Sequence, residues 1–333
     1  MSVSEDPQVL VSEVGPRDGP QSIKAVMATA DKLRWITALA AAGLREIEVG
    51  SFVPVRLLPQ MADVREVVAH ALAIPGLRVA ALAPNLRGAE SAFEAGVHKL
   101  TLPVSVTEAH SLANIRKTPA QMIDEVRAIV ALRDARFPSV QIEAGVSVAF
   151  GCTLAGAVSD DETIAMAAAM AECGVDEIGL SDTSGYANPA QVRRLFMRLR
   201  REVGDKAGGA HFHNTRGQGL ANVVAALDAG VTTLDASQGG LGGCPYAPGA
   251  TGNIVTEDLV FLLEAMGYDT GIDVDALLAA RPILHAALPS EALYGHVPDA
   301  GLPKGFRYAD GRYADGRAPS TSQPEGCLTG VAQ

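Results

Sequence analysis

The chain has 333 residues, a net charge of −11 and a hydrophobic fraction of 48%. That length suits one α/β barrel with additions or two ordinary domains, and the hydrophobic fraction is ample for a packed core. An acidic chain argues against nucleic acid or an anionic membrane as a partner, because both favour basic surfaces.

The N-terminal stretch MSVSEDPQVL lacks a basic segment followed by an apolar one, so no signal peptide is predicted. No uninterrupted apolar run is long enough to cross a bilayer. The four cysteines, Cys152, Cys173, Cys244 and Cys327, form no C-x-x-C pair and match neither a zinc-site spacing nor a disulfide framework. We therefore expect a reducing, cytoplasmic location.

Short β-branched runs alternate with longer Ala/Leu-rich stretches of helical period. Strands are predicted at 9–14, 44–49, 77–83, 97–103, 140–150, 175–181, 208–213 and 231–237. Helices are predicted at about 29–42, 58–73, 86–95, 119–135, 160–173, 189–203, 217–229 and 254–267. Several helices end in a glycine just before a strand, as at Gly96 and Gly174, where a left-handed residue closes a helix.

Eight alternating βα units predict a parallel sheet closed into a (β/α)₈ TIM barrel with extra C-terminal helices. A doubly wound open sheet is the alternative, but the first βα turn lacks the G-x-G-x-x-G fingerprint. We divide the chain into a catalytic barrel over 1–270, a helical extension over 271–304 and a flexible tail over 305–333. The tail is rich in Gly, Pro, Ser and Asp and repeats the pentapeptide RYADG.

The active site of such a barrel lies at the C-terminal ends of its strands. Charged and metal-ligating residues gather at these predicted ends: Glu13, Arg17, Asp18, Glu48, Asp182, His211, His213, Cys244 and Asn253. Taken singly, several have plainer interpretations. Arg17 and Asp18 are consistent with a surface ion pair, Glu48 with a helix cap and Lys24 with a solvated charge.

The stretch HFHNTRGQG holds two histidines one residue apart at the end of a predicted strand. Strand side chains alternate between faces, so His211 and His213 share one face while Phe212 packs on the other. Two imidazoles with oxygen ligands suit Mg²⁺, Mn²⁺ or Zn²⁺. Paired core or surface histidines are the alternative, but Asp18 and Asn253 on the same rim favour a metal.

Six segments carry a family likeness: EVGPRDGPQS, IEVGSFV, PQMAD, APNLRG, HFHNTRGQGLAN and GLGGCPYAPGATGNIVTEDLVFLLEAMGYDTGID. They resemble the 3-hydroxy-3-methylglutaryl-CoA lyase family of metal-dependent (β/α)₈ enzymes, which is related to isopropylmalate and citramalate synthases. The likeness runs from about residue 9 to 285, and its most specific part is 239–272. It implies a retro-Claisen cleavage that yields acetyl-CoA and acetoacetate, a divalent metal, an acyl-CoA substrate and a dimer.

The resemblance also implies roles for individual residues. The metal ligands would be Asp18, His211, His213 and Asn253. Arg17 would stabilise the enolate oxygen, Glu48 and Asp182 would lie near the substrate hydroxyl, and His211 or a carboxylate would act as base. Cys244, in a glycine-rich lid, would help to protonate the acetyl-CoA carbanion, and Lys24 would lie near CoA.

Three places depart from the family pattern: the segment 107–118, the stretch HNTRG (213–217), where the lyases usually read His-Asp-Thr-Tyr-Gly, and the stretch GPQ (19–21), where they have Gly-Leu-Gln. The segment TEAHSLANIRKT (107–118) has Arg116 and Lys117 where the lyases usually carry an Asn and a small residue. His110 and Asn214 are similar to residues of the Claisen synthases, which lack the lid. We hypothesise that Arg116 and Arg216 enlarge the positive field at the mouth and hold a substrate carboxylate. A Claisen synthase or aldolase acting on 2-oxoacids is the alternative function, and a non-catalytic binding protein is a third.

Overall fold

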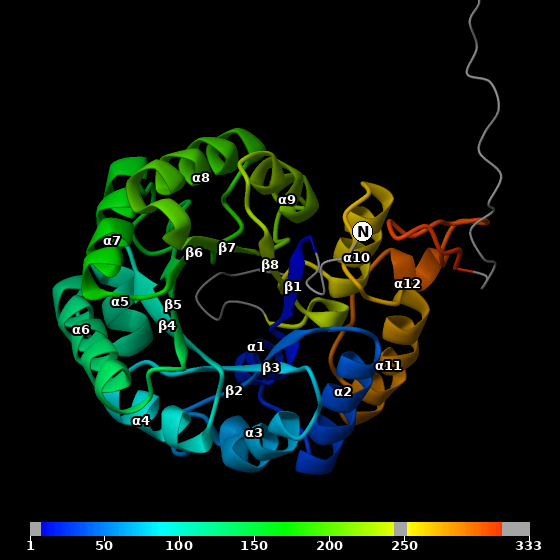
Figure 1. The fold of residues 1–333 in the computed structure, drawn as a ribbon, viewed down its shortest axis with the longest axis horizontal. Coiled ribbons are helices and arrows are strands. Elements are labelled where there is room, and N and C mark those ends of the chain that lie inside the picture. The colour runs from blue at the N-terminus through cyan, green and yellow to red at the C-terminus, as the bar shows by residue number, and fades with distance from the viewer. Residues whose placement is uncertain (1–7, 243–251, 315–333) are drawn as a thin grey trace, which may run out of the picture.

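Eight parallel strands close into a barrel in chain order, and β8 pairs with β1. The computed structural model describes residues 8–242 and 252–314. The strands are β1 (Leu10–Glu13), β2 (Glu46–Ser51), β3 (Arg78–Leu82), β4 (Lys99–Ser105), β5 (Gln141–Ser147), β6 (Glu177–Asp182), β7 (Ala207–Phe212) and β8 (Thr233–Ala236). The predicted TIM barrel is confirmed (Figure 1).

Helices surround the barrel on the outside, and two short ones lie at its mouth (Figure 1). They are α1 (Gly15–Ser22), α2 (Thr29–Ala41), α3 (Val64–Leu72), α4 (Leu86–Ala95), α5 (Glu108–Ile115), α6 (Pro119–Arg136), α7 (Asp160–Cys173), α8 (Pro189–Val203), α9 (Gly219–Asp228), α10 (Thr256–Ala265), α11 (Val274–Ala287) and α12 (Val297–Ala300). Three 3₁₀ turns are η1 (Pro59–Met61), η2 (Gly204–Lys206) and η3 (Gln238–Gly240). None of the helices within 8–242 and 252–314 combines the length and apolarity needed to cross a membrane.

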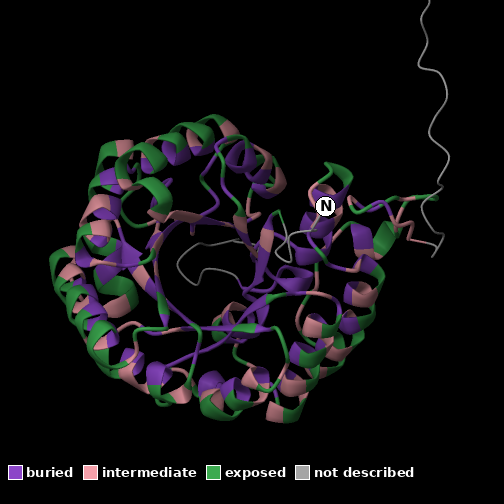
Figure 2. Ribbon diagram, in the orientation of Figure 1, coloured by how far each residue is buried: buried purple, intermediate pink, exposed green. Residues whose placement is uncertain are grey.

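The hydrophobic core lies between the strands and the inner faces of the helices, while the outer helix surfaces are exposed (Figure 2). On β5, buried Ile142, Ala144 and Val146 alternate with less buried residues that face the barrel interior. The strict period of two therefore places every second strand residue inside the barrel, where a site can form.

Local sequence signals set the helix ends. Ser159 and Glu162 form a capping box at the start of α7, as Thr118 and Gln121 do at α6. The glycine predicted to close α7, Gly174, is left-handed with φ of 92°. Such a φ is strained for any residue with a Cβ.

The sequence prediction missed two helices, α1 and α5, at the mouth of the barrel. Two prolines and two glycines in the eight residues of α1 hide its helical character. Pro16 lies in the first turn, where the N–H that it lacks has no intrahelical partner. As a result, Arg17 and Asp18 stand on a short helix that begins two residues after β1 ends.

The C-terminal region packs against the barrel helices, and α11 lies against α2. The prediction of a flexible tail from residue 305 is wrong for residues 305–314. Tyr308 is buried and its hydroxyl accepts a hydrogen bond of 3.0 Å from the Val274 amide, while the Phe306 ring lies 5.2 Å from that of Phe261. Tyr308 of the RYADG repeat and Phe306 just before it thus have core partners that a composition-based argument overlooks. Residues 315–333 lie outside the described part of the chain.

Candidate active site

A cavity of about 460 Å³ opens at the C-terminal ends of the strands. Its wall includes Arg17, Asp18, His211 and His213, which the sequence placed at this rim, together with Asp235. The cavity extends down into the barrel and outward to the segment around Arg116. It therefore joins three of the four predicted ligands, Asp18, His211 and His213, in one space, as the strand-end rule for these barrels requires.

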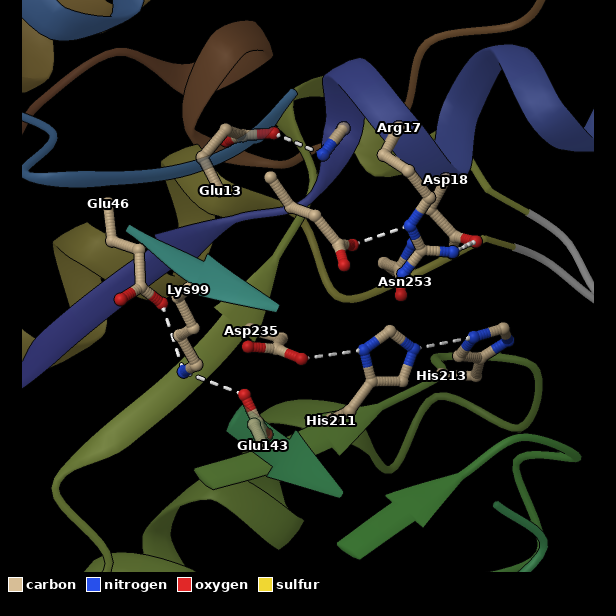
Figure 3. Close-up of polar contacts among 12 residues, drawn as sticks. Glu13, Arg17, Asp18, Glu46, Lys99, Glu143, His211, His213, Asp235 and Asn253 are labelled. Carbon is tan, nitrogen blue, oxygen red and sulfur yellow. Dashed lines mark hydrogen bonds and ion pairs between the residues drawn. The ribbon is translucent and has the colours of Figure 1, made fainter. Parts of the chain in front are cut away.

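Asp18, His211 and His213 each aim one ligand atom at a common point, with these atoms within 4.8 Å of one another. The Nε2 atoms of the two histidines face each other at 3.1 Å (Figure 3). His211 Nδ1 lies 3.0 Å from Asp235 Oδ2, an arrangement that keeps the proton on Nδ1 and leaves the Nε2 lone pair toward the cluster. This group of side chains can hold a divalent metal ion.

Asn253 joins the same group from the loop before α10. Its Nδ2 donates to Asp18 Oδ2 at 2.8 Å and to the Leu241 carbonyl at 3.0 Å. Its Oδ1 is buried and has no partner among the described residues, and neither has His213 Nδ1. A buried polar atom without a partner is costly, so an amide oxygen left free beside a carboxylate and two imidazoles fits a cation.

Arg17 lies beside the cluster and is held by two carboxylates. Its Nε donates to Glu48 Oε2 and its Nη1 to Asp18 Oδ1, both at 2.5 Å. Burial opposes the charged form of Asp18, but the Arg17 guanidinium and the two histidines hold its pKa below the ordinary value. Burial raises the pKa of Glu48 despite Arg17, and Glu48 Oε1 is buried without a partner in the described chain.

Glu13, labelled in Figure 3, connects the two segments that carry Asp18 and Asn253. Its carboxyl accepts hydrogen bonds from the Gly15 and Gln238 amides, both at 2.9 Å, and from the Thr256 hydroxyl at 2.6 Å. Gly15 begins the helix that carries Arg17 and Asp18, and Thr256 begins the helix that follows Asn253. One buried carboxyl thus sets the spacing between ligands that are 235 residues apart.

Asp235 is a site residue that the sequence analysis missed. Burial opposes a charged His211, but the hydrogen bond and charge of Asp235 outweigh it and raise the pKa of His211. The signal in the sequence was a single carboxylate in the apolar run VTTLDAS. In the structure Asp235 shares a strand face with Thr233 and pairs in register with His211.

We expect Asp235→Ala to weaken Mn²⁺ binding by about 10–100-fold, the usual cost of losing the carboxylate behind a ligating histidine. Isothermal titration calorimetry with Mn²⁺ measures this change. Asp228→Ala, on the exposed end of α9, is the matched control and should bind as the unaltered protein does. Equal affinities for the two variants would show that Asp235 does not support His211.

Asp182 ends β6 but does not line the cavity. Its carboxylate accepts from the Tyr186 amide at 2.8 Å and the Ala187 amide at 3.1 Å, which shapes the loop that leads to α8. Burial raises its pKa to about 6. A direct role of Asp182 at the substrate hydroxyl stays a prediction, because its carboxylate is bound to two backbone amides of the following loop.

Lys24 and Arg216 lie apart from the cluster. Cys244 lies outside the described residues. Lys24 is exposed on the segment between α1 and α2 and is not part of the cavity wall. Arg216 donates to the Ser184 and Gly185 carbonyls at 3.1 and 3.0 Å and stacks on Tyr186. Arg216 thus fastens the loop after β6 and is not part of the cavity wall, and the hypothesis that it adds charge to the mouth stays a prediction.

Arg116, in contrast, lines the cavity. It ends α5 with a left-handed φ of 58°, and its guanidinium has no hydrogen-bond partner among the described residues. His110 also lines the cavity, and its Nδ1 lies 2.8 Å from the Ser105 hydroxyl. The loop that departs from the family pattern thus forms one wall of the site.

Comparison with known proteins agrees with this geometry. The family model described as HMGL-like matches residues 8–283. The hydroxymethylglutaryl-CoA lyase YngG of Bacillus subtilis is 40% identical over 82% of this chain and 91% of its own length. A Pseudomonas aeruginosa protein named 3-hydroxy-3-isohexenylglutaryl-CoA/hydroxymethylglutaryl-CoA lyase is 41% identical over 84% of this chain and 93% of its own length.

Among solved structures, an HMG-CoA lyase from Acinetobacter baumannii in complex with coenzyme A and 3-methylmalate superimposes with a TM-score of 0.84. It is 37% identical, and the match covers 92% of this chain and 99% of that one. The predicted resemblance is thereby confirmed by sequence and by structure. The chain belongs to the HMGL-like family, together with these hydroxymethylglutaryl-CoA lyases.

Proposed function

We propose that this protein is a divalent-metal-dependent carbon–carbon lyase. It cleaves a 3-hydroxy-3-methylglutaryl-CoA-like thioester to acetyl-CoA and a 3-oxoacid. The observation that carries this proposal is the guanidinium of Arg17 beside the Asp18–His211–His213 cluster, within a single cavity. A site for a cation next to an oxyanion donor is what a retro-Claisen cleavage needs.

The ligands of the cation are Asp18, His211, His213 and Asn253. Carboxylate and amide oxygens with two imidazoles favour Mg²⁺ or Mn²⁺ and admit Zn²⁺. Once bound, the ion acts as a Lewis acid and template for the hydroxyl and carboxylate of the substrate. The acidic ligand Asp18 stays ionised for this task because Arg17 and the histidines outweigh the effect of its burial.

Side chains of the protein accept the proton of the substrate hydroxyl and stabilise the negative charge that develops on the thioester oxygen. His211 has both ring nitrogens engaged, one with Asp235 and one toward the cluster, so we assign the base to Glu48, whose Oε1 is unpartnered within the described chain. Glu48 takes the hydroxyl proton, the C2–C3 bond breaks, and the hydroxyl carbon becomes the ketone of the 3-oxoacid. Arg17 meets the charge that develops on the thioester oxygen.

The carbanion of acetyl-CoA then takes up one proton, and we assign its delivery to Cys244. Lys24 is assigned to the CoA portion of the substrate.

The cysteine pattern and acidic charge support a cytoplasmic location, and the family resemblance supports a homodimer. A thioester whose acyl end is anionic also suits a mouth that carries Arg116.

Mass spectrometry of products from a panel of hydroxyacyl-CoA esters tests the reaction directly. We expect acetyl-CoA and a 3-oxoacid in equal amounts from a 3-hydroxy-3-methylglutaryl-CoA-like ester, and no product after EDTA treatment until Mg²⁺ or Mn²⁺ is restored. Consumption of acetyl-CoA together with a 2-oxoacid, or release of pyruvate, would identify a synthase or aldolase instead. Full turnover in EDTA would refute the metal-dependent lyase.

A further inference from the structure

The cavity continues below the metal cluster into a layer of the barrel where three strands carry glycine. Gly145, Gly179 and Gly209 all line it, on β5, β6 and β7. Gly145 pairs in register with Gly179, and Gly209 stands two residues before His211 on the same strand face. Bulky branched side chains usually fill the interior layers of a TIM barrel. None of these three positions projects a side chain into the cavity, although the Glu143 carboxyl occupies the space over Gly179; we call this layer the glycine chamber.

Gly145 leaves room that a side chain can use. A Cβ built there meets its nearest atoms at 3.7 and 3.8 Å, which is ordinary van der Waals contact. The backbone of Gly145 is not in the left-handed region, so no turn or positive φ demands glycine at this position. Glycine at this position therefore enlarges the cavity, and the backbone conformation does not require it.

A carboxyl group forms the floor of the glycine chamber. Glu143 lies two residues before Gly145 and also lines the cavity. Its Oε2 pairs with Lys99 at 2.7 Å (Figure 3). Its Oε1 lies over Gly179, 2.6 Å from where a Cβ would stand. The Lys99 ammonium is shared with Glu46 at 3.4 Å and Glu177 at 3.1 Å, neither of which is part of the cavity wall.

The other walls of the cavity near the chamber are polar too. Thr101, Ser147 and Ser181 line it, as does His110. A purely apolar group placed there would shut these hydroxyls and the second carboxyl oxygen of Glu143 away from water and offer them no hydrogen bond in return. The chamber thus fits a group that reaches down past the cluster and ends in a hydrogen-bond donor.

We propose that the substrate carries at C3 a hydroxyalkyl group longer than methyl, which fills the glycine chamber and donates its terminal hydroxyl to Glu143. This inference rests on the proposed lyase function and names its substrate class. Glu143 lies two residues, about 6.6 Å, before Gly145 along β5. A 3-hydroxypropyl group reaches about 5 Å from C3 to its oxygen, and the hydrogen bond to the carboxyl covers the remaining distance. The name of the Pseudomonas aeruginosa relative joins two C3 substituents of different size, isohexenyl and methyl.

The test measures kcat/KM of the Mn²⁺-loaded protein for three glutaryl-CoA esters with a 3-hydroxyl group. Their C3 substituents are methyl, n-butyl and 3-hydroxypropyl, so the last two match in length and differ in one polar atom. We expect the hydroxypropyl ester to exceed the methyl ester by about tenfold or more and the butyl ester by a larger factor. A site built to bind a hydroxyl discriminates strongly against the analogue that lacks it.

Two variants separate the roles of space and polarity. Gly145→Leu fills the chamber and should lower the hydroxypropyl-to-methyl ratio by about tenfold or more. Glu143→Gln should lower the hydroxypropyl-to-butyl ratio. Glu46→Gln is the matched control, because it also removes a carboxylate from Lys99 but lies off the cavity, and it should leave both ratios unchanged.

Preference for the methyl ester, with ratios that Gly145→Leu does not alter, would overturn the inference and leave the lyase function standing. A preference for the butyl ester over the hydroxypropyl ester would also overturn the inference, because it would show that Glu143 does not bind a terminal hydroxyl. Lack of cleavage of all three esters by the metal-loaded protein would refute the proposed function, and the inference with it.

Discussion

Replacement of Arg17 by methionine should lower kcat by about 10²–10³-fold and change KM little, because one oxyanion donor acts mainly in the transition state. The guanidinium lines the cavity beside the metal cluster and is fixed by Glu48 and Asp18. Its orientation is therefore set before the substrate arrives, and no reorganisation is needed when charge develops on the thioester oxygen. Steady-state kinetics with the preferred ester measures both constants.

The substitution also removes a partner from two carboxylates, so metal binding must be measured alongside. A Mn²⁺ affinity close to that of the unaltered protein would assign the loss of kcat to the missing donor. If kcat stays within about threefold of the original while the protein is folded and metal-loaded, Arg17 is not the oxyanion donor.

Replacement of His213 by alanine should reduce turnover to the level of the uncatalysed reaction. Its Nε2 faces that of His211, so alanine removes one of the convergent donors and leaves Asp18 and Asn253 with an incomplete set. We expect Mn²⁺ binding to fall below detection in calorimetry and kcat to be lost with it. A metal that keeps too few ligands is not retained at working concentrations.

His285→Ala provides the matched control, because this histidine is exposed on α11, away from the cavity. It should bind Mn²⁺ and turn over substrate as the original protein does. Full activity of His213→Ala would show that the histidine pair does not serve the reaction.

The sequence predicted the barrel well because each of its signals is local. Alternation of two residues defines the strands, a helical period defines the helices, and Gly96 and Gly174 close α4 and α7 as expected. The rule that sites lie at strand ends then brought Asp18 and the two histidines together without knowledge of any contact.

What the sequence missed depends on contacts between distant segments. Asp235 and Glu143 look like single polar breaks in apolar runs until register places one against His211 and the other under Gly179. Arg216 follows the histidines in the chain, but its guanidinium is taken up by two carbonyls of a neighbouring loop. Tyr308 finds its place only through the core of α10 and α11. Periodicity carries no information about such pairings.

Anomalous diffraction from crystals grown with Mn²⁺ tests the central claim most directly. The account predicts one strong peak at the barrel mouth, about 2.0–2.3 Å from Asp18, from Nε2 of both histidines and from Oδ1 of Asn253. Arg17 should lie beside that peak without touching it. A peak bound elsewhere, or a mouth in which the two Nε2 atoms still face each other with no ion between them at saturating Mn²⁺, would contradict it.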